Sequence, residues 1–194
     1  MYLIGDIGNS EIKICLVNSK KQIIKKINFN SKNTSLRKIQ KNFKFLNKHY
    51  LNINKILFCS VVPNIFQLIK NYLKTKTNTK CYEIKSLNLS SLLKIKLKYS
   101  QVGSDRIANS ISLAKPQKNF IIIDLGTATT FDVLIGKNYI GGIIAPGIKI
   151  SLNTLSDNAS LIPKIDLKKI RKVIGKDTKS AVRSGFFLGL YWFN

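Results

Sequence analysis

Asp124 and Gly126 stand where an apolar run stops, and residues of these types could bind an anion through a cation. The run occupies 120–123, and hydroxyl residues follow the glycine at 127, 129 and 130. A β-branched run that stops at Asp-x-Gly predicts a buried strand ending in a tight turn. Successive N–H groups in such a turn form an anion-binding concavity, which glycine lets a bulky anion approach. A carboxylate helps there only when a cation lies between it and the anion, so the segment indicates a turn for phosphate plus metal.

A second turn of the same design lies near the N-terminus. Asp6 and Gly8 follow another apolar run and align with Asp124 and Gly126 at a constant offset of 118 residues. The strands that leave the two turns align at the same offset. One Asp-x-Gly turn is a weak signal, but two that join matched strands are hard to obtain by chance. The repeat predicts two similar domains that face each other, each contributing one phosphate turn.

A third stretch whose residues could take part in binding or catalysis begins at Gly103. The glycine loosens a turn, Ser104 can cap a helix, and the apolar spacing that follows gives a helical face. Asp105 and Arg106 then fall in the first helical turn. The helix dipole favours Asp105 there but opposes Arg106, and the chain uses only four arginines against 29 lysines. A cation kept at position 106 indicates a bound anion or carboxylate.

Composition bounds the class of protein. The 194 residues suffice for one large domain or two small ones, and a hydrophobic content of 44% is that of a globular protein. The net charge of +24 would ordinarily indicate nucleic acid or an anionic membrane. However, the excess is lysine, and asparagine and isoleucine are also abundant, which is the residue set of AT-rich codons. Arginine is the preferred reader of phosphate and guanine, so its scarcity weakens the nucleic-acid interpretation.

The cysteines and the two apolar termini favour a cytoplasmic protein. Cys15, Cys59 and Cys81 show no Cys-x-x-Cys spacing and lie in apolar runs, as expected of core thiols in a reducing compartment. Acidic residues interrupt the apolar run at 1–17, which argues against a signal peptide. The apolar run at 185–193 is too short to span a bilayer.

The elements that must position the first turn follow from apolar spacing and capping signals. After the hairpin within 2–17, the chain is expected to form a strand at 21–29, a helix from Thr34 or Ser35 to about 47, a strand at 55–62, a helix at 63–74 and a strand at 80–84. The lysine- and serine-rich segment 86–98 is expected to be a connecting loop or short helix.

The second half repeats this plan but stops early. The hairpin at 120–136 is followed by an expected strand at 139–145, a helix at about 147–158 and a helix from Asp177 or Thr178 to about Leu190. We divide the chain into domains at 1–115 and 116–194 and expect the second domain to be incomplete, as a fragment or as a shortened enzyme that compensates in a dimer. The apolar residues of the last helix would be exposed unless a partner covers them. These residues are Phe186, Phe187, Leu188, Leu190, Trp192 and Phe193.

Four motifs in this order closely resemble the type III pantothenate kinase family of the actin-like ATPase and sugar-kinase superfamily. The motifs are Asp6-Ile7-Gly8-Asn9-Ser10, Gly103-Ser104-Asp105-Arg106, Asp124-Leu125-Gly126-Thr127 and the segment from Gly141 to Gly147. The resemblance covers essentially the whole chain. It implies an α/β fold of two ribonuclease-H-like half-domains related by an internal repeat, the second truncated at its C-terminus.

The resemblance assigns ATP to the two turns. The implied ATP-binding residues are Asp6, Ile7, Gly8, Asn9, Ser10, Glu11, Ile12, Lys13 and Thr127. Asp6 would hold Mg²⁺ directly or through water at the phosphates. Asp124 matches the position for a monovalent cation, K⁺ or NH₄⁺. Ser10 stands where the family usually has threonine and keeps the hydroxyl.

The resemblance assigns pantothenate to the third motif, with Asp105 as the general base. The implied substrate-binding residues are Tyr99, Gly103, Ser104, Asp105, Arg106 and Thr178. Thr178 would act from the partner subunit of a homodimer. The implied reaction transfers the γ-phosphoryl group of ATP to the primary hydroxyl of pantothenate. The product is 4'-phosphopantothenate, and the reaction is the first step of coenzyme A biosynthesis.

Three other functions remain open. A catalytically impaired member could bind nucleotide without turnover, as the shortened second domain suggests. The net charge of +24 motivates a basic regulatory or nucleic-acid-binding protein, for which steep salt dependence would be diagnostic. Another acyl, acetate or sugar kinase of the superfamily would share the phosphate turns, but Gly-x-Asp-Arg before a helix argues against it. The intact motifs favour the active kinase.

Overall fold

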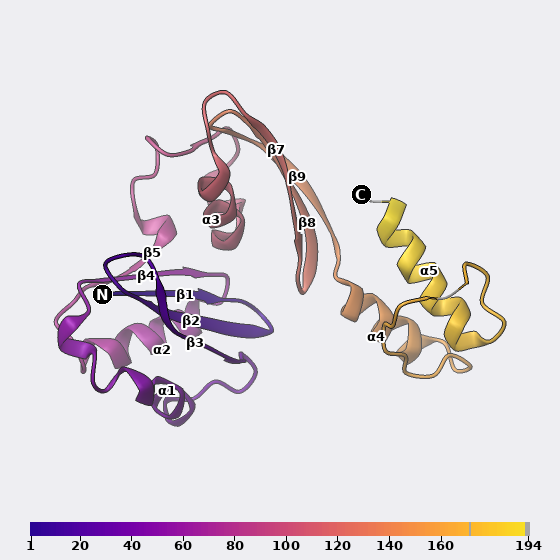
Figure 1. Ribbon diagram of the computed structural model, residues 1–194, viewed down its shortest axis with the longest axis horizontal. Helices are drawn as coiled ribbons and strands as arrows, with labels where there is room; N and C mark the ends of the chain where they lie inside the picture. The colour runs from indigo at the N-terminus through magenta and orange to yellow at the C-terminus, as the bar shows by residue number, and fades with distance from the viewer. Residues whose placement is uncertain (171, 193–194) are drawn as a thin grey trace. The chain divides into compact units, whose positions relative to one another are not determined.

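The computed structural model describes residues 1–170 and 172–192, and its chain contacts form two compact units. Unit 1 comprises Met1–Ile122 and Asp132–Gly141. Unit 2 comprises Ile123–Phe131 and the chain from Gly142 onward. Figure 1 shows the helices and strands of both units. The division into domains at 115 and 116 stays a prediction.

Unit 1 contains a mixed five-stranded sheet with the order β3-β2-β1-β4-β5. Its strands are β1 (Tyr2–Ile7), β2 (Glu11–Val17), β3 (Ile23–Asn30), β4 (Lys55–Ser60) and β5 (Cys81–Glu83). The first three strands form an antiparallel meander, whereas β4 runs parallel to both β1 and β5. Asp6 therefore lies opposite Lys13 on one neighbour and opposite Cys59 on the other.

Two helices cover this sheet on the same face (Figure 1). They are α1 (Leu36–Phe43), which Ser35 caps through a bond from the Lys38 N–H, and α2 (Pro63–Lys74), which begins at its proline. Ile39 and Phe43 share one face of α1 and are fully buried, and Phe43 packs edge-on against Tyr72 of α2. Each buried aliphatic or aromatic side chain of this kind stabilises the fold by roughly 1.5–3 kcal/mol. The apolar spacing predicted both helices because their buried residues recur with the helical period, but α1 ends at Phe43 and a 3-10 turn (Lys44–Leu46) follows it, short of the predicted end at about 47.

The second sheet has the order β6-β9-β8-β7. Its strands are β6 (Lys94–Ile95), β7 (Asn119–Leu125), β8 (Ala128–Ile135) and β9 (Asn138–Pro146). The hairpin of β7 and β8 matches that of β1 and β2 at the predicted offset, so this part of the repeat is confirmed. Segment 86–98 is not only the loop or short helix that we expected, because β6 pairs in parallel with β9. Two residues of strand have too little periodicity to be recognised in the sequence.

The run at 120–123 forms a strand, as predicted, but the prediction that this strand is buried is wrong. Along β7 the exposure alternates, and Ile121 and Leu125 are 69% and 61% exposed. On the other face, Phe120 and Ile122 pack against a second hydrophobic core. A continuous apolar run does not reveal whether both faces of its strand are covered. In the described structure β7 stands at the end of the sheet order and is packed on one face.

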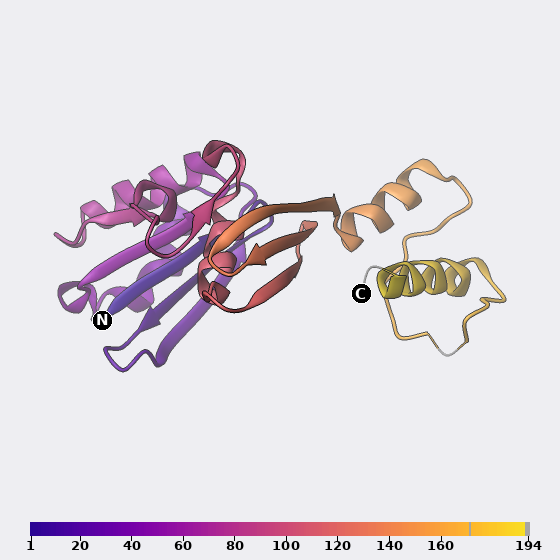
Figure 2. The ribbon, with the colours of Figure 1, turned by 90° about the horizontal axis from the view of Figure 1, so that it is seen from above.

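Three further helices complete the described chain. They are α3 (Ser104–Leu113) in unit 1, and α4 (Ile148–Asn158) and α5 (Thr178–Trp192) in unit 2. Ile107 of α3 is fully buried in the second core together with Leu134 and Tyr139. Helices α4 and α5 lie beside each other in unit 2 (Figures 1 and 2). None of the helices, over the described ranges, has both the length and the hydropathy required to cross a bilayer.

Candidate active site

The parallel pairing of β1 and β4 brings Asp6 and Cys59 together. Parallel strands end at the same edge of a sheet, which is where α/β folds place their ligands. The Cys59 thiol donates to Asp6 Oδ1 at 3.5 Å and lies 3.7 Å from the Gly5 carbonyl oxygen. Burial, followed by the neighbouring Asp6 carboxylate, raises the pKa of Cys59 to about 12. The thiol is therefore a protonated donor to Asp6 at neutral pH.

The first Asp-x-Gly turn is closed and anchored by backbone bonds. The Gly8 N–H donates to the Glu11 carbonyl at 3.0 Å. Ser31, at the end of β3, donates its hydroxyl to the Gly8 carbonyl at 2.6 Å and its N–H to the Ser10 carbonyl at 3.0 Å. Asn9 is exposed at the tip, as is Ser10. The turn is therefore fixed at its base and presents its tip outward.

The remaining residues of this segment divide into core and surface. Ile7 and Ile12 are fully buried, so they can reach a ligand only through backbone atoms. Lys13 is exposed, and the Glu11 carboxylate accepts a bond from the Asn28 side-chain amide at 2.6 Å.

The first turn of α3 carries Asp105 toward the same edge of the sheet. Asp105 Oδ1 accepts the N–H of Arg106 at 2.8 Å. The Asp105 charge contributes to the raised pKa of Cys59, so Asp6 and Asp105 both lie near that thiol. A Cβ atom at Gly103 would overlap Asp105 Oδ1 and would lie 3.7 Å from Val61, which follows β4. The structure therefore brings the two predicted carboxylates into one region of unit 1.

Ser104 does not cap the helix, contrary to our prediction. Gly103 occupies the N-cap, and Ser104 lies inside the first turn, where it is 2% exposed. Its hydroxyl donates to Glu83 Oε1 at 2.5 Å, and Glu83 Oε2 accepts the N–H of Lys85. The half-buried carboxylate of Glu83 in β5 accepts the serine hydroxyl, so Ser104 anchors the start of the helix to the sheet.

The predicted carboxylate partner of Arg106 is a side chain of the same chain. Arg106 Nε and Nη2 lie 2.8 Å and 2.5 Å from Oδ1 of Asp132 in β8. The Tyr139 hydroxyl donates to the same oxygen at 2.6 Å. Burial opposes the charged form of Arg106, but the bond with Asp132 and its charge hold the arginine pKa above the ordinary value. Asp132 and Tyr139 were not predicted from the sequence, although an acidic residue inside the apolar run Phe-Asp-Val-Leu indicates a buried carboxylate that needs a cation.

Tyr99 lies in a short 3-10 turn (Tyr99–Gln101), and Lys85 holds this turn in place through hydrogen bonds. The Lys85 amino group donates to the carbonyls of Ser100 and Val102 at 3.2 Å and 2.9 Å. It also lies 5.4 Å from the centre of the Tyr99 ring, within the range of a cation–π contact. The loop before Gly103 is thereby fixed to the same segment that binds Ser104.

The second Asp-x-Gly turn, in unit 2, has its own anchor. The Gly126 N–H donates to the Ala128 carbonyl at 3.0 Å, and the Gly147 N–H donates to the Thr127 carbonyl at 3.1 Å. A Cβ atom at Gly147 would overlap the carbonyl oxygens of Gly126 and Thr127. Ser31 follows β3 and Gly147 follows β9. In each half, the residue after the third strand of the meander therefore donates a bond to a carbonyl of the Asp-x-Gly turn. Asp124 and the exposed Thr127 lie in this turn, and the exposed Thr178 begins α5.

Comparison with known proteins decides the family. A family model described as type III pantothenate kinase matches residues 2–193. The chain belongs to the type III pantothenate kinase family. A type III pantothenate kinase of Pelagibacter ubique (strain HTCC1062) is 56% identical over 189 residues, which cover 97% of this chain and 76% of the relative. Type III pantothenate kinase 1 of Francisella tularensis subsp. tularensis (strain FSC 198) is 35% identical over 202 residues, with the same shares of 97% and 76%.

The same fold occurs in a crystal structure of a Baf family protein from Campylobacter jejuni. Its TM-score is 0.55 at 22% identity, and the match covers 98% of this chain and 76% of that one. The predicted α/β class is confirmed: this type III pantothenate kinase combines two β-sheets with α-helices along the described chain.

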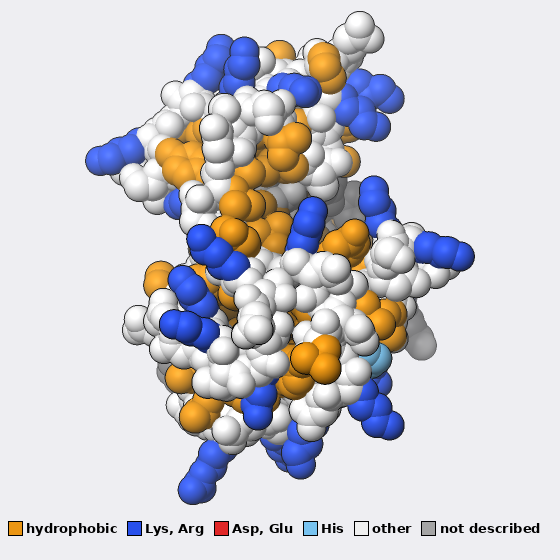
Figure 3. Space-filling view, turned by 90° about the vertical axis from the view of Figure 1, so that its left-hand side faces the viewer, with side chains coloured by type: hydrophobic (Ala, Val, Ile, Leu, Met, Phe, Trp, Pro, Cys, Tyr) orange, Lys and Arg blue, Asp and Glu red, His pale blue; other side chains and the backbone are white. Residues whose placement is uncertain are grey.

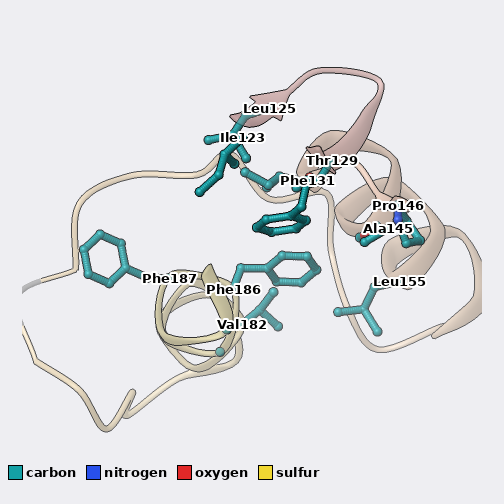
Figure 4. Close-up of a pocket in the computed structure, with 14 residues that line it drawn as sticks. Ile123, Leu125, Thr129, Phe131, Ala145, Pro146, Leu155, Val182, Phe186 and Phe187 are labelled. Carbon is teal, nitrogen blue, oxygen red and sulfur yellow. The ribbon is translucent and has the colours of Figure 1, made fainter. Parts of the chain in front are cut away.

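Unit 2 of this type III pantothenate kinase also contains an apolar cavity of about 530 Å³. Phe131 of β8 and Ile123 of β7 face Phe186 and Val182 of α5 across it (Figure 4). Phe186 and Phe187 are half-buried rather than fully exposed, because α5 packs toward the strands. The side chains of Leu190 and Trp192, and residue 193, lie outside what the structure describes. Among the described residues, no charged side chain lines the cavity. The cavity lining therefore contains no cation that could neutralise a bound phosphate.

A magnesium site of the kind used in phosphoryl transfer fits the first turn. Mg²⁺ keeps several waters and binds through one or two carboxylates plus substrate phosphates. Asp6 provides one such carboxylate, half-buried at the open edge of the sheet. Over residues 1–170 and 172–192, no three histidine, cysteine, aspartate or glutamate side chains converge as a complete protein cage.

Proposed function

We propose that this chain transfers the γ-phosphoryl group of ATP to pantothenate and forms 4'-phosphopantothenate, the first step of coenzyme A biosynthesis. The observation that carries the proposal is the convergence of Asp6 and Asp105 near Cys59, at the edge of the sheet where β1 and β4 end. One carboxylate lies beside a phosphate turn and the other begins a helix in the family's substrate motif. Phosphoryl transfer needs positioning and charge neutralisation more than covalent chemistry.

We assign the triphosphate of ATP to the anchored turns. Asn9 and Ser10 present their side chains at the exposed tip of the first turn beside Gly8, and Lys13 adds a cation from β2. Thr127 contributes the corresponding contact from the second turn. Asp6 would hold Mg²⁺, which would supply charge neutralisation at the phosphates. We propose further that Asp124 serves a monovalent cation, K⁺ or NH₄⁺.

We assign pantothenate to the segment from Tyr99 to Arg106. Asp105 accepts the proton of the primary hydroxyl as the P–O bond forms, because the hydroxyl becomes acidic only at that stage. The Arg106 N–H orients this carboxylate. The guanidinium of Arg106 binds Asp132 through Nε and Nη2.

We also propose a homodimer in the cytoplasm. Thr178 is exposed at the start of α5, where a partner subunit could use it as a substrate contact. Cys15, Cys59 and Cys81 carry free thiols, which fits a reducing compartment. Sedimentation of the purified chain with and without pantothenate tests the dimer.

The decisive experiment incubates the purified chain with ATP, Mg²⁺ and pantothenate, with and without K⁺, and measures phosphopantothenate by mass spectrometry. Asp105→Asn should lose about 10²- to 10⁴-fold in turnover, the usual contribution of a general base, and should retain ATP binding. Asp157→Asn, which alters an exposed aspartate of α4, is the matched control and should behave as wild type. Near-wild-type turnover in Asp105→Asn would remove that residue from the role.

Nucleic-acid binding is the second candidate, because the net charge is +24. Figure 3 shows the Lys and Arg side chains scattered over the visible face rather than gathered into one stripe. A dedicated nucleic-acid site concentrates its basic residues. Affinity for duplex DNA that is sequence-selective and falls steeply with salt would support this candidate. Weak binding without sequence preference would reflect net charge alone.

A further inference from the structure

The buried carboxylate of Asp132 is bonded through one oxygen only. Its Oδ1 receives Nε and Nη2 of Arg106 and the hydroxyl of Tyr139. Its Oδ2 is buried and has no hydrogen-bond partner, and the residue is 0% exposed. Taking a carboxylate and a guanidinium out of water is expensive, and a buried ion pair often stabilises a fold less than an apolar pair of equal volume. Stability alone therefore does not account for this arrangement.

The arrangement is directly connected to the proposed catalytic base. Arg106 is held by its side chain to Asp132 and donates its backbone N–H to Asp105 Oδ1 at 2.8 Å. Its guanidinium also lies 5.9 Å from the centre of the Tyr139 ring. The Arg106 side chain is 13% exposed, so packing leaves it little freedom. One residue thus connects the buried carboxylate in β8 to the carboxylate at the start of α3.

We propose that Asp132, assisted by Tyr139, is a positioning residue. The two side chains form a lock that holds the Arg106 side chain in place, and the lock thereby fixes the first turn of α3, which carries Asp105 and the proposed pantothenate contacts. The inference rests on the proposed function for its substrate. It predicts that weakening the lock impairs pantothenate use more than ATP use, because the lock acts on the helical turn that carries Asp105. A purely structural role would lower stability and leave the two KM values in their wild-type ratio.

Tyr139→Phe is the mild test, because it removes only the hydroxyl that bonds Asp132. A net hydrogen bond is equivalent to about a threefold to tenfold change in an equilibrium constant. The KM for pantothenate should rise by about that factor, and the KM for ATP should stay at the wild-type value. Tyr50→Phe is the matched control, because Tyr50 shares a buried hydroxyl pair with Tyr72 in the first core, at 3.1 Å. It should lower the melting temperature similarly and change neither KM.

Asp132→Asn is the strong test, because it leaves the Arg106 charge without its carboxylate. Misplacement of a catalytic group by about 1 Å lowers turnover about 100-fold, and kcat/KM for pantothenate should fall by about this factor. If this variant does not fold, Tyr139→Phe decides the matter alone. A Tyr139→Phe enzyme that loses as much stability as Tyr50→Phe but keeps the wild-type KM for pantothenate would overturn the proposal.

Amide hydrogen exchange separates this inference from the proposed function. The Arg106 N–H is bonded to Asp105 in the wild type, and its exchange should be faster in Tyr139→Phe and unchanged in Tyr50→Phe. This readout requires no substrate. If the wild-type chain formed no phosphopantothenate, the proposed function would fail, whereas faster exchange in Tyr139→Phe would still support the lock. Wild-type exchange in Tyr139→Phe would refute it.

Discussion

A single methyl group at Gly103 should disable the proposed base without disturbing the fold. The backbone there has φ −62° and ψ 147°, which alanine adopts freely. The new Cβ would overlap Asp105 Oδ1 and make only an ordinary contact of 3.7 Å with Val61. The carboxylate is the end of a flexible side chain, so the clash is relieved by its rotation. The perturbation therefore acts on the position of Asp105.

The magnitude follows from what the rotation breaks. Asp105 loses the charge-assisted bond from the Arg106 N–H, now 2.8 Å long. A displacement of about 1 Å at a reacting group lowers turnover about 100-fold, or about 2.7 kcal/mol in the barrier. Stability should change little, because alanine is a poorer N-cap than glycine but restricts the unfolded chain, and each effect is about 1 kcal/mol with opposite sign.

The assay compares Gly103→Ala with wild type by steady-state formation of phosphopantothenate, ATP binding by calorimetry and thermal unfolding. Gly185→Ala is the matched control, because its Cβ would meet nothing within 4 Å. That substitution lies inside α5 and should raise stability by up to about 1 kcal/mol at unchanged turnover. If Gly103→Ala kept both wild-type turnover and wild-type stability, the placement of Asp105 as the base would be refuted.

Two further predictions concern the other turn and the thiol beside Asp6. Gly147→Ala should raise the KM for ATP about tenfold, because its Cβ would push against the carbonyls of Gly126 and Thr127 and break a backbone bond that supports the turn; an unchanged KM for ATP would count against a phosphate contact there. Cys59 should resist iodoacetamide at neutral pH and react faster only as the pH approaches its pKa of about 12, since the thiolate is the nucleophile. Peptide mass spectrometry across pH measures this rate, and rapid labelling at neutral pH would contradict it.

The helices and hairpins were predictable because their signals are local. The helix at 63–74 has the predicted bounds, since its proline start and apolar spacing are both properties of neighbouring residues. The two Asp-x-Gly turns were recognised because a strand followed by glycine is encoded within a few positions. Strand β6 was missed because two residues acquire a strand conformation only by pairing with β9.

The sequence by itself determined the family, the two turns and the segment that carries Asp105. The tertiary structure decided which groups hold those residues in place. Ser104 bonds Glu83 instead of capping α3, and Arg106 bonds Asp132, 26 residues further along the chain. The physical reason is that buried charges are satisfied by whichever opposite charge the packing of strands and helices brings near. Local sequence indicates that Arg106 needs an anion, and only the fold identifies that anion as Asp132.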